Sequence, residues 1–219
     1  MPGVADHLYR GQAPDGAKVF CLFVHGRSQS PEEMETAVIR RLSDLPVCFV
    51  LPRAEGAMWY SARAIDPLTA TTRAELARSL DDLAALMGKV RAEAGTRPLL
   101  LAGFSQGACL ALEMAFSGRA APDAVAAFTG CRVGTADCDR PAEPLRDMPV
   151  YLTGASADPW IPVHAFADAV TALGQGRAAL RADLFHDRPH EVSEPEIAML
   201  DGMLMDLASG QRPRMEAAR

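Results

Sequence analysis

The chain has 219 residues, and its hydrophobic content of 49% is enough apolar material for the buried core of one α/β domain. The formal net charge is −6 at pH 7, and the lysines and arginines are scattered along the sequence. This pattern excludes a basic patch for phosphates, so nucleic acid is not an expected partner.

We expect no membrane anchor in this sequence. Residues 1–16 lack a charged start followed by an apolar core, and no later apolar run approaches the roughly 18 residues of a membrane span. Five cysteines form no Cys-x-x-Cys pair, so we expect free thiols rather than disulfides or a metal site. We therefore expect one cytoplasmic domain over 1–219, a monomer or homodimer without stable membrane association, whose tail from about 210 to 219 is disordered.

Short apolar segments rich in Val, Leu and Phe predict the strands of one sheet. They alternate with helical patterns, which indicates a mostly parallel sheet covered by helices on both faces. The segments lie at 18–24, 46–52, 98–104, 124–130, 149–154 and 180–185.

The first of these segments leads into the loop VHGRSQSPEEM. The Ser-Pro-Glu-Glu at 30–33 has the spacing of a capping box with proline in the first turn, so the loop is expected to end at a helix N-terminus. A loop between an early strand and a helix N-terminus can supply one backbone N–H to an oxyanion, and we assign this N–H to Arg27. Its side chain would be free to face solvent or a substrate group. Alternatively, Gly26 only forms a turn at the strand end.

After the second segment, the stretch MWYSAR precedes a long helical pattern. We expect Met58 and Trp59 to border the substrate cleft, with a purely structural role as an equal alternative. Leucines and a valine at spacings of three and four predict an amphipathic helix over about 72–94, which belongs to the scaffold.

The third segment ends in LLLAGFSQGA, which places Ser105 between Gly103 and Gly107. This matches G-x-S-x-G, whose tight turn from strand to helix requires residues almost without side chains on both sides of the serine. We interpret Ser105 as a nucleophile rather than a turn serine, with the backbone N–H of Gln106 as second oxyanion donor. The following segment, ACLALEMAF, has a single charged residue and predicts a helix that is buried nearly all round.

A serine nucleophile needs a base and an orienting acid from later strands. Asp158 follows the strand at 149–154, and the alternative for it is an Asp-Pro turn former. His190 lies between the last strand and a second capping box at 193–196 and is the predicted base, with His186 as competitor. The other histidines suit the required chain order less well; they are His7, His25 and His164.

With VHGRSQS, AGFSQGA, GASADPWIPV and RPHEV assembled, the sequence resembles the phospholipase/carboxylesterase family of α/β-hydrolases, over about residues 16–208. The resemblance implies Ser105, Asp158 and His190 as a catalytic triad, with backbone N–H groups of Arg27 and Gln106 as the oxyanion hole and no metal or cofactor. One departure is Ser28, where the family usually has a second glycine, and MWYSAR fits the usual substrate segment only approximately. Catalytic identity is therefore better supported than substrate identity.

We expect an α/β-hydrolase fold without a large cap domain, because no insertion is long enough to form one. The expected activity is a serine carboxylesterase that acts on soluble esters of short to medium acyl chains, with thioesters as a second class. The open cleft would be bordered by Met58, Trp59 and Ile161. The alternatives are a lysophospholipase or acyl-protein thioesterase and, without catalysis, a hydrolase-like protein that only binds its ligand.

Overall fold

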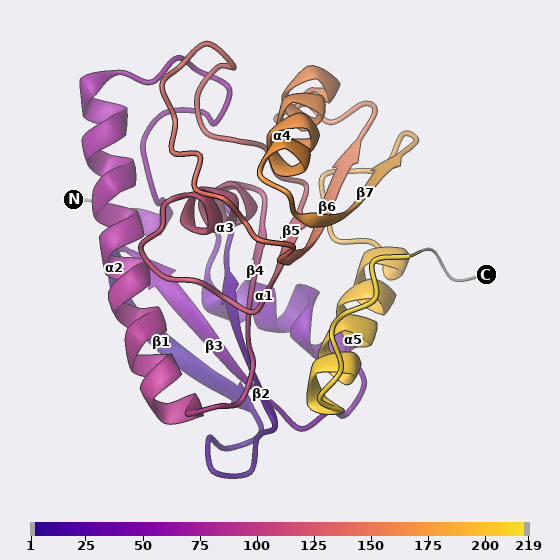
Figure 1. Cartoon of the computed structure of the whole chain (residues 1–219). Helices are drawn as coiled ribbons and strands as arrows, with labels where there is room; N and C mark the ends of the chain where they lie inside the picture. Colours follow the sequence, from indigo (N-terminus) through magenta and orange to yellow (C-terminus); the bar gives the residue numbers. More distant parts are fainter. Residues whose placement is uncertain (1–2, 217–219) are drawn as a thin grey trace.

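The computed structural model describes residues 3–216, which are built around one seven-stranded sheet (Figure 1). The strand order is β1-β3-β2-β4-β5-β6-β7, and neighbouring strands run parallel except for β1, which pairs antiparallel with β3. The strands are β1 (Val4–Gly11), β2 (Val19–Val24), β3 (Val47–Ala54), β4 (Leu99–Phe104), β5 (Ala124–Phe128), β6 (Pro149–Ala155) and β7 (Ala179–Phe185).

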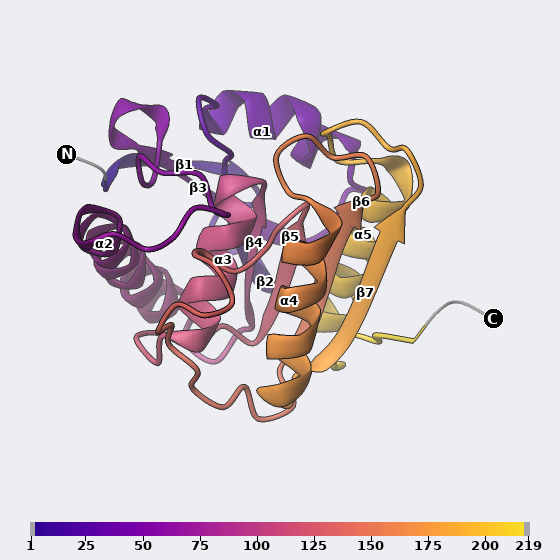
Figure 2. The same ribbon diagram turned by 90° about the horizontal axis from the view of Figure 1, so that it is seen from above.

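Five α-helices in the described chain connect these strands and cover the sheet. They are α1 (Pro31–Ala37), α2 (Ala70–Ala94), α3 (Gln106–Phe116), α4 (Val163–Gln175) and α5 (Glu194–Ala208). Seen from above, α2, α3 and α4 lie on one face of the sheet, and α1 and α5 lie on the other (Figure 2). The prediction of a mostly parallel sheet covered on both faces is confirmed.

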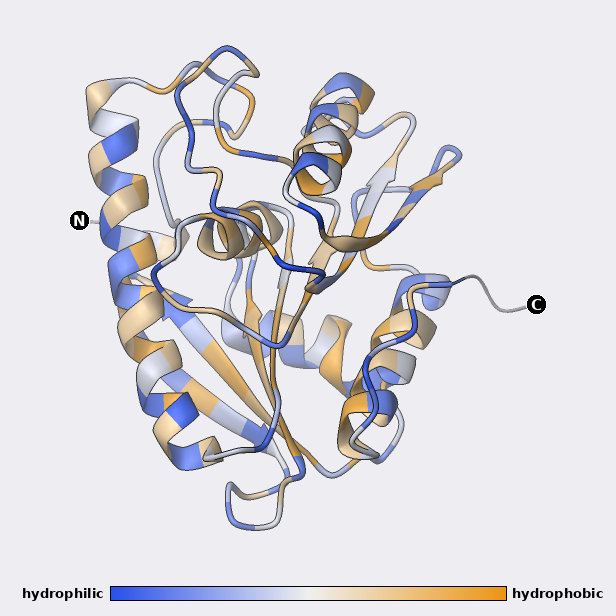
Figure 3. Cartoon of the chain, viewed as in Figure 1, coloured by the Kyte–Doolittle hydropathy of each residue, from blue (hydrophilic) through white to orange (hydrophobic). Residues whose placement is uncertain are grey.

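Side chains that alternate along the central strands fill two separate cores. On β2, Phe20 and Leu22 pack toward α2, α3 and α4, whereas Cys21 and Phe23 pack toward α1 and α5. The central strands are therefore buried on both faces, which explains their nearly continuous apolar sequences. Figure 3 shows the hydrophobic residues along the central strands and the alternation of hydrophilic and hydrophobic residues along α2.

Strand β1 is the element that the sequence did not predict. Its sequence VADHLYRG is largely polar, and its residues are half-buried or exposed at the edge of the sheet. An edge strand with one solvated face has no continuous apolar run, and its pairing with β3 is irregular between Val4 and Asp6. Propensity alone therefore gave no signal for it.

Both predicted capping motifs fix helix starts. The Ser30 hydroxyl accepts a hydrogen bond from the Glu33 N–H at 3.2 Å, and the Ser193 N–H donates to Oε2 of Glu196 at 2.7 Å. The predicted leucines of α2 are buried, and α3 is buried along almost its whole length. The loops after β2 and β7 therefore end at defined positions, the N-termini of α1 and α5.

The chain after α5 has contacts that the sequence did not predict. Residues 211–216 form no helix or strand, but Pro213 is buried, Met215 packs against the core, and Arg214 contacts Asp206 with Nη2 3.1 Å from Oδ1. Residues 217–219 of the expected tail lie outside the described residues. Within 3–216, no helix is long and apolar enough to cross a membrane.

Candidate active site

Ser105 lies in the tight turn between β4 and α3. Its φ of 53° is in the left-handed half of backbone space, which is strained for a residue with a side chain. A Cβ on Gly103 would lie 2.4 Å from the carbonyl oxygen of Gly107, and one on Gly107 would lie 2.2 Å from that of Val24. Only glycine fits at both positions, so the G-x-S-x-G spacing is a steric requirement of this turn.

His190 and Asp158 reach Ser105 from two other loops. The Ser105 hydroxyl lies 2.9 Å from Nε2 of His190, and Nδ1 of the same ring lies 2.6 Å from Oδ2 of Asp158. The other carboxylate oxygen, Oδ1, accepts hydrogen bonds from the N–H groups of Trp160 and Ile161, both at 2.8 Å. The structure therefore brings together the three residues that the sequence singled out, in a continuous chain of hydrogen bonds.

The environment of Asp158 favours its charged form. Burial alone raises the pKa of this carboxyl, but the hydrogen bond from His190 and those from the two backbone N–H groups outweigh it and leave the pKa below its usual value. An ionised carboxylate holds the proton of the imidazole on Nδ1. This leaves Nε2 free to accept a proton from the Ser105 hydroxyl.

The other histidines lie outside this chain of hydrogen bonds. His186 has a side chain that is 89% exposed, and its Nε2 lies 3.2 Å from Asp187. His25 is fully buried, where its Nε2 accepts from the Ala54 N–H at 3.0 Å, and burial lowers its pKa. Its role is structural, since both ring nitrogens are occupied by backbone groups.

Arg27 and Gln106 line the same cavity as Ser105. In the described part of the chain, neither backbone N–H has a hydrogen-bond acceptor. A Cβ on Gly26 would lie 3.2 Å from Cβ of Ser105, so the loop after β2 passes directly beside the serine. The N–H groups of Arg27 and Gln106 thus belong to the two segments that flank Ser105, the loop after β2 and the start of α3.

The expectation that the Arg27 side chain is free is wrong. Its guanidinium donates to the backbone carbonyls of Tyr60 and Ser61, both at 3.0 Å, and to that of Ala62. Three carbonyls of one turn converge there, and the planar guanidinium has enough donors for all of them. The Arg27 side chain therefore orders the chain at the cleft through these three carbonyls.

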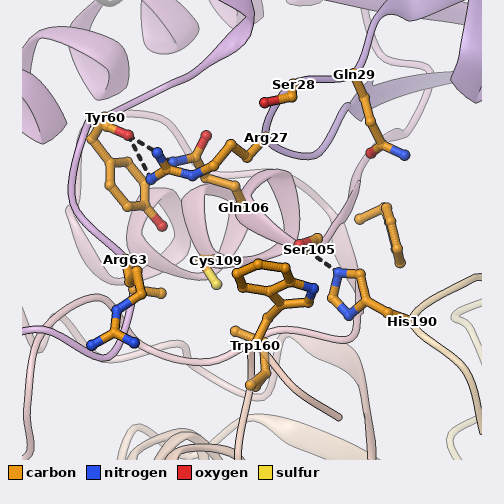
Figure 4. A pocket seen from close by; sticks show the side chains of 13 residues that line it. Arg27, Ser28, Gln29, Tyr60, Arg63, Ser105, Gln106, Cys109, Trp160 and His190 are labelled. Atoms are coloured by element: carbon orange, nitrogen blue, oxygen red, sulfur yellow. Dashed lines mark hydrogen bonds between the residues drawn. The ribbon is translucent and has the colours of Figure 1, made fainter.

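The cleft itself is a cavity of about 350 Å³ beside Ser105 (Figure 4). Ile161 lines it, as expected, but Met58 and Trp59 do not. Trp59 is fully buried, with its indole N–H donating to the His25 carbonyl at 2.8 Å. The segment that contains Trp59 is held against the start of α3, because the Gln106 side-chain oxygen accepts a hydrogen bond from the Trp59 N–H at 3.0 Å.

Aromatic residues that the sequence analysis did not single out take the places of Met58 and Trp59. Tyr60 and Trp160 line the cavity together with Phe104 and Cys109, and Trp160 is 59% exposed at its mouth. Trp160 follows Asp158 by two residues, and this proximity to the acid was the available signal. All five cysteines are unpaired, and residues 3–216 contain no group of three His, Cys, Asp or Glu side chains that could hold a metal ion.

The sequence model of the phospholipase/carboxylesterase family matches residues 17–205, a range that includes every loop of this site. The chain belongs to the phospholipase/carboxylesterase family. This confirms the resemblance and identifies the protein as an ester-hydrolysing enzyme. No curated protein sequence matches the chain.

Solved structures show that the family fold extends over nearly the whole chain. A phospholipase/carboxylesterase from Dyadobacter fermentans is 24% identical with a TM-score of 0.80, and the match covers 93% of this chain and 98% of that one. SOBER1 from Arabidopsis thaliana is 16% identical with a TM-score of 0.71, covering 86% and 98%. The carboxylesterase from Bacillus cereus is 13% identical with a TM-score of 0.69, covering 92% and 93%. At these identities the likeness supports the fold.

Proposed function

We propose that this family member is a serine carboxylesterase that works through an acyl-enzyme on Ser105. The observation that carries the proposal is the hydrogen-bond chain from Ser105 through His190 to the ionised Asp158. A serine hydroxyl becomes a useful nucleophile only when a base accepts its proton, and this geometry provides one.

In the proposed reaction, Ser105 Oγ attacks the ester carbonyl carbon while its proton passes to Nε2 of His190. The N–H groups of Arg27 and Gln106 donate to the oxyanion, and Gln106 adds the positive end of α3. The intermediate collapses when the imidazolium returns the proton to the leaving alcohol. Water then attacks the acyl-serine with His190 again as base, and the acid and free enzyme are released.

The size of the cavity supports soluble esters of short to medium acyl chains as substrates. A volume of about 350 Å³ lies at the lower end of the range of about 300–1,000 Å³ for ligand pockets. The alternative substrates are lysophospholipids or acylated proteins. The observation in their favour is exposed apolar surface on one segment of the chain: Trp160, which lines the cavity, is 59% exposed, and Val163, three residues further along the chain, is 40% exposed.

The activity is tested with a soluble aryl ester and the matching aryl thioester. The variant Ser105→Ala should lose turnover of both, while Ser117→Ala, at the other end of α3, should keep it. Near-normal turnover by folded Ser105→Ala would refute the mechanism. Turnover of the thioester alone would move the assignment to a thioesterase.

We also propose a cytoplasmic enzyme that acts on a small-molecule ester, as a monomer or homodimer. The five unpaired cysteines support a reducing compartment, because secreted proteins tend to oxidise such thiols. Separation into cytoplasmic and exported fractions tests the location, and sedimentation tests the assembly.

A further inference from the structure

A buried polar network lies behind the loop that carries His190. Its charged members are Arg188, which is 8% exposed, and Glu196, which is fully buried in the first turn of α5. Nη2 of Arg188 lies 3.5 Å from Oε1 of Glu196. No atom of either residue lines the cavity beside Ser105.

Arg188 fixes the backbone on both sides of the catalytic histidine. Its Nη1 donates to the carbonyl of Pro189 at 2.9 Å and to the carbonyl of Glu191. These are the residues immediately before and after His190, so the loop curls around the guanidinium. An ammonium group lacks the planar fork of donors that this arrangement uses.

The same guanidinium reaches the strand beside the nucleophile. Nη2 donates to the Thr129 hydroxyl at 2.7 Å, and Thr129 directly follows β5, whose last carbonyl, on Phe128, accepts from the Ser105 N–H at 2.9 Å. Thr129 has a φ of 54°, a strained value for a β-branched residue. Its N–H donates to the hydroxyl of Thr153 at 2.8 Å.

Glu196 closes the network. Its Oε1 accepts from the Thr153 hydroxyl at 2.5 Å, and its Oε2 accepts from the N–H and hydroxyl of Ser193 at 2.7 and 2.5 Å. Thr153 lies on β6, the strand that leads to Asp158. The network thus connects β5, β6, the His190 loop and the start of α5, which are the supports of all three triad residues.

Stability does not account for this arrangement. A buried ion pair adds little net stability, because desolvation of both charges offsets their attraction. In addition, Nε of Arg188 has no hydrogen-bond partner among residues 3–216, which is a cost to folding. What distinguishes the network is the geometry that it imposes on the loop around His190.

We propose that Arg188 and Glu196 are positioning residues that hold His190 within hydrogen-bonding distance of both Ser105 and Asp158. They touch none of the reacting atoms and act through the backbone around His190. The kinetic part of this proposal rests on the proposed esterase function, whereas its structural part does not.

The primary test compares Arg188→Met with Arg132→Met. Arg132 forms another buried pair, with its Nε 2.7 Å from Oε1 of Glu113 and side-chain exposures of 3% and 1%. Each variant leaves a buried glutamate without its arginine, so each loses stability for the same reason. A displacement of about 1 Å costs about 100-fold in rate, so Arg188→Met should lose kcat by about that factor with little change in KM, and Arg132→Met should keep kcat.

A double variant distinguishes a displacement of His190 from a general loss of protein stability. Replacing both members of a buried ion pair by apolar residues is often neutral for folding, so Arg188→Met with Glu196→Met should fold. It should still show the loss of kcat. A folded double variant with kcat within about twofold of the wild type would overturn the proposal, as would an equal loss in Arg132→Met, because neither fits a displacement of His190.

Proton NMR gives a readout that needs no turnover. The proton held between Nδ1 of His190 and Asp158 should give a downfield resonance in the wild type and in Arg132→Met, and it should weaken or vanish in the double variant. A resonance unchanged in the double variant would overturn the positioning role. A wild type that hydrolyses no ester would contradict the proposed function, and the NMR comparison would still decide the role of Arg188 and Glu196.

Discussion

Asp158 illustrates how the environment of one side chain sets its chemistry. Its carboxylate is buried, yet it accepts hydrogen bonds from His190, Trp160 and Ile161, which together lower its pKa. The charge is thereby kept in a place where an unpartnered carboxyl would become neutral. The same charge would stabilise the imidazolium that forms during the reaction.

Replacing Asp158 by Asn should lower kcat by roughly 10⁴, because an amide no longer stabilises the imidazolium or its correct tautomer. Steady-state hydrolysis of a soluble aryl ester measures the effect. Asp187→Asn, an exposed aspartate on the neighbouring loop, is the matched control and should retain activity. A loss of less than about tenfold in Asp158→Asn would assign the orienting role to another residue.

Asp158 should also affect stability in acid. Its pKa in the folded protein is lower than the ordinary 3.8, so its contribution is present above that value and is lost as the pH falls through the lowered pKa. The difference in unfolding free energy between the wild type and Asp158→Asn should be constant near neutrality and should shrink below pH 3.8. Denaturant titrations from neutral to acidic pH measure it, and a difference independent of pH would contradict this assignment.

The hydrogen-bonded group of Ser105, His190 and Asp158 could be predicted from the sequence, because each residue follows a strand and has a local motif. The roles of Arg27 and Trp59 could not, because their partners come from distant parts of the chain. The Arg27 guanidinium binds the carbonyls at 60–62, and the Trp59 indole binds the carbonyl of His25. The sequence shows only that Arg27 carries a cation and Trp59 an aromatic ring. The groups that these side chains bind are determined by tertiary contacts.

The turn between β4 and α3 depends on the packing of whole elements. The α3 helix starts so close to β2 that Gly107 lies against the backbone of Val24 and His25. The apolar strand and the G-x-S-x-G spacing were enough to predict this turn. Strand β1, by contrast, has no such pattern, and only its pairing with β3 makes it a strand.

Gly107→Ala should destabilise the protein by about 1–3 kcal/mol, because its Cβ would meet backbone atoms that cannot move aside. Gly202→Ala, in the exposed part of α5 with no atom within 4 Å of a new Cβ, should instead stabilise it by about 0.5–1 kcal/mol. Thermal unfolding of the two variants and the wild type measures both changes in stability. Equal shifts in Tm would contradict the close approach of α3 and β2.

The molecule as a whole consists of one sheet, two cores and an open cleft. The helices cover the two faces of the sheet, and the loops at the carboxyl ends of β2, β4, β6 and β7 supply the site (Figures 1 and 2). The described chain has no cap domain over this cleft. The fold class followed from the alternation of strands and helices, but the shape of the cleft depends on which loop residues turn inward.

Acyl chain length should therefore have a limited effect on activity. Each buried methylene adds about 0.8 kcal/mol, or roughly fourfold in kcat/KM, until the cavity is full. Rates for acetyl to palmitoyl esters, measured below their micelle limits, should rise and then level off or fall. A steady rise through the longest chains would favour the lysophospholipase or acyl-protein thioesterase alternative.

The central claim is that Ser105 carries the acyl group during turnover, and covalent labelling tests it most directly. After treatment with a fluorophosphonate, peptide mass spectrometry should find one adduct per chain, on Ser105, with ester hydrolysis lost in proportion to labelling. Ser117→Ala should be labelled like the wild type, and Ser105→Ala should not be labelled. A folded wild type that hydrolyses esters without an adduct on Ser105 would contradict the account.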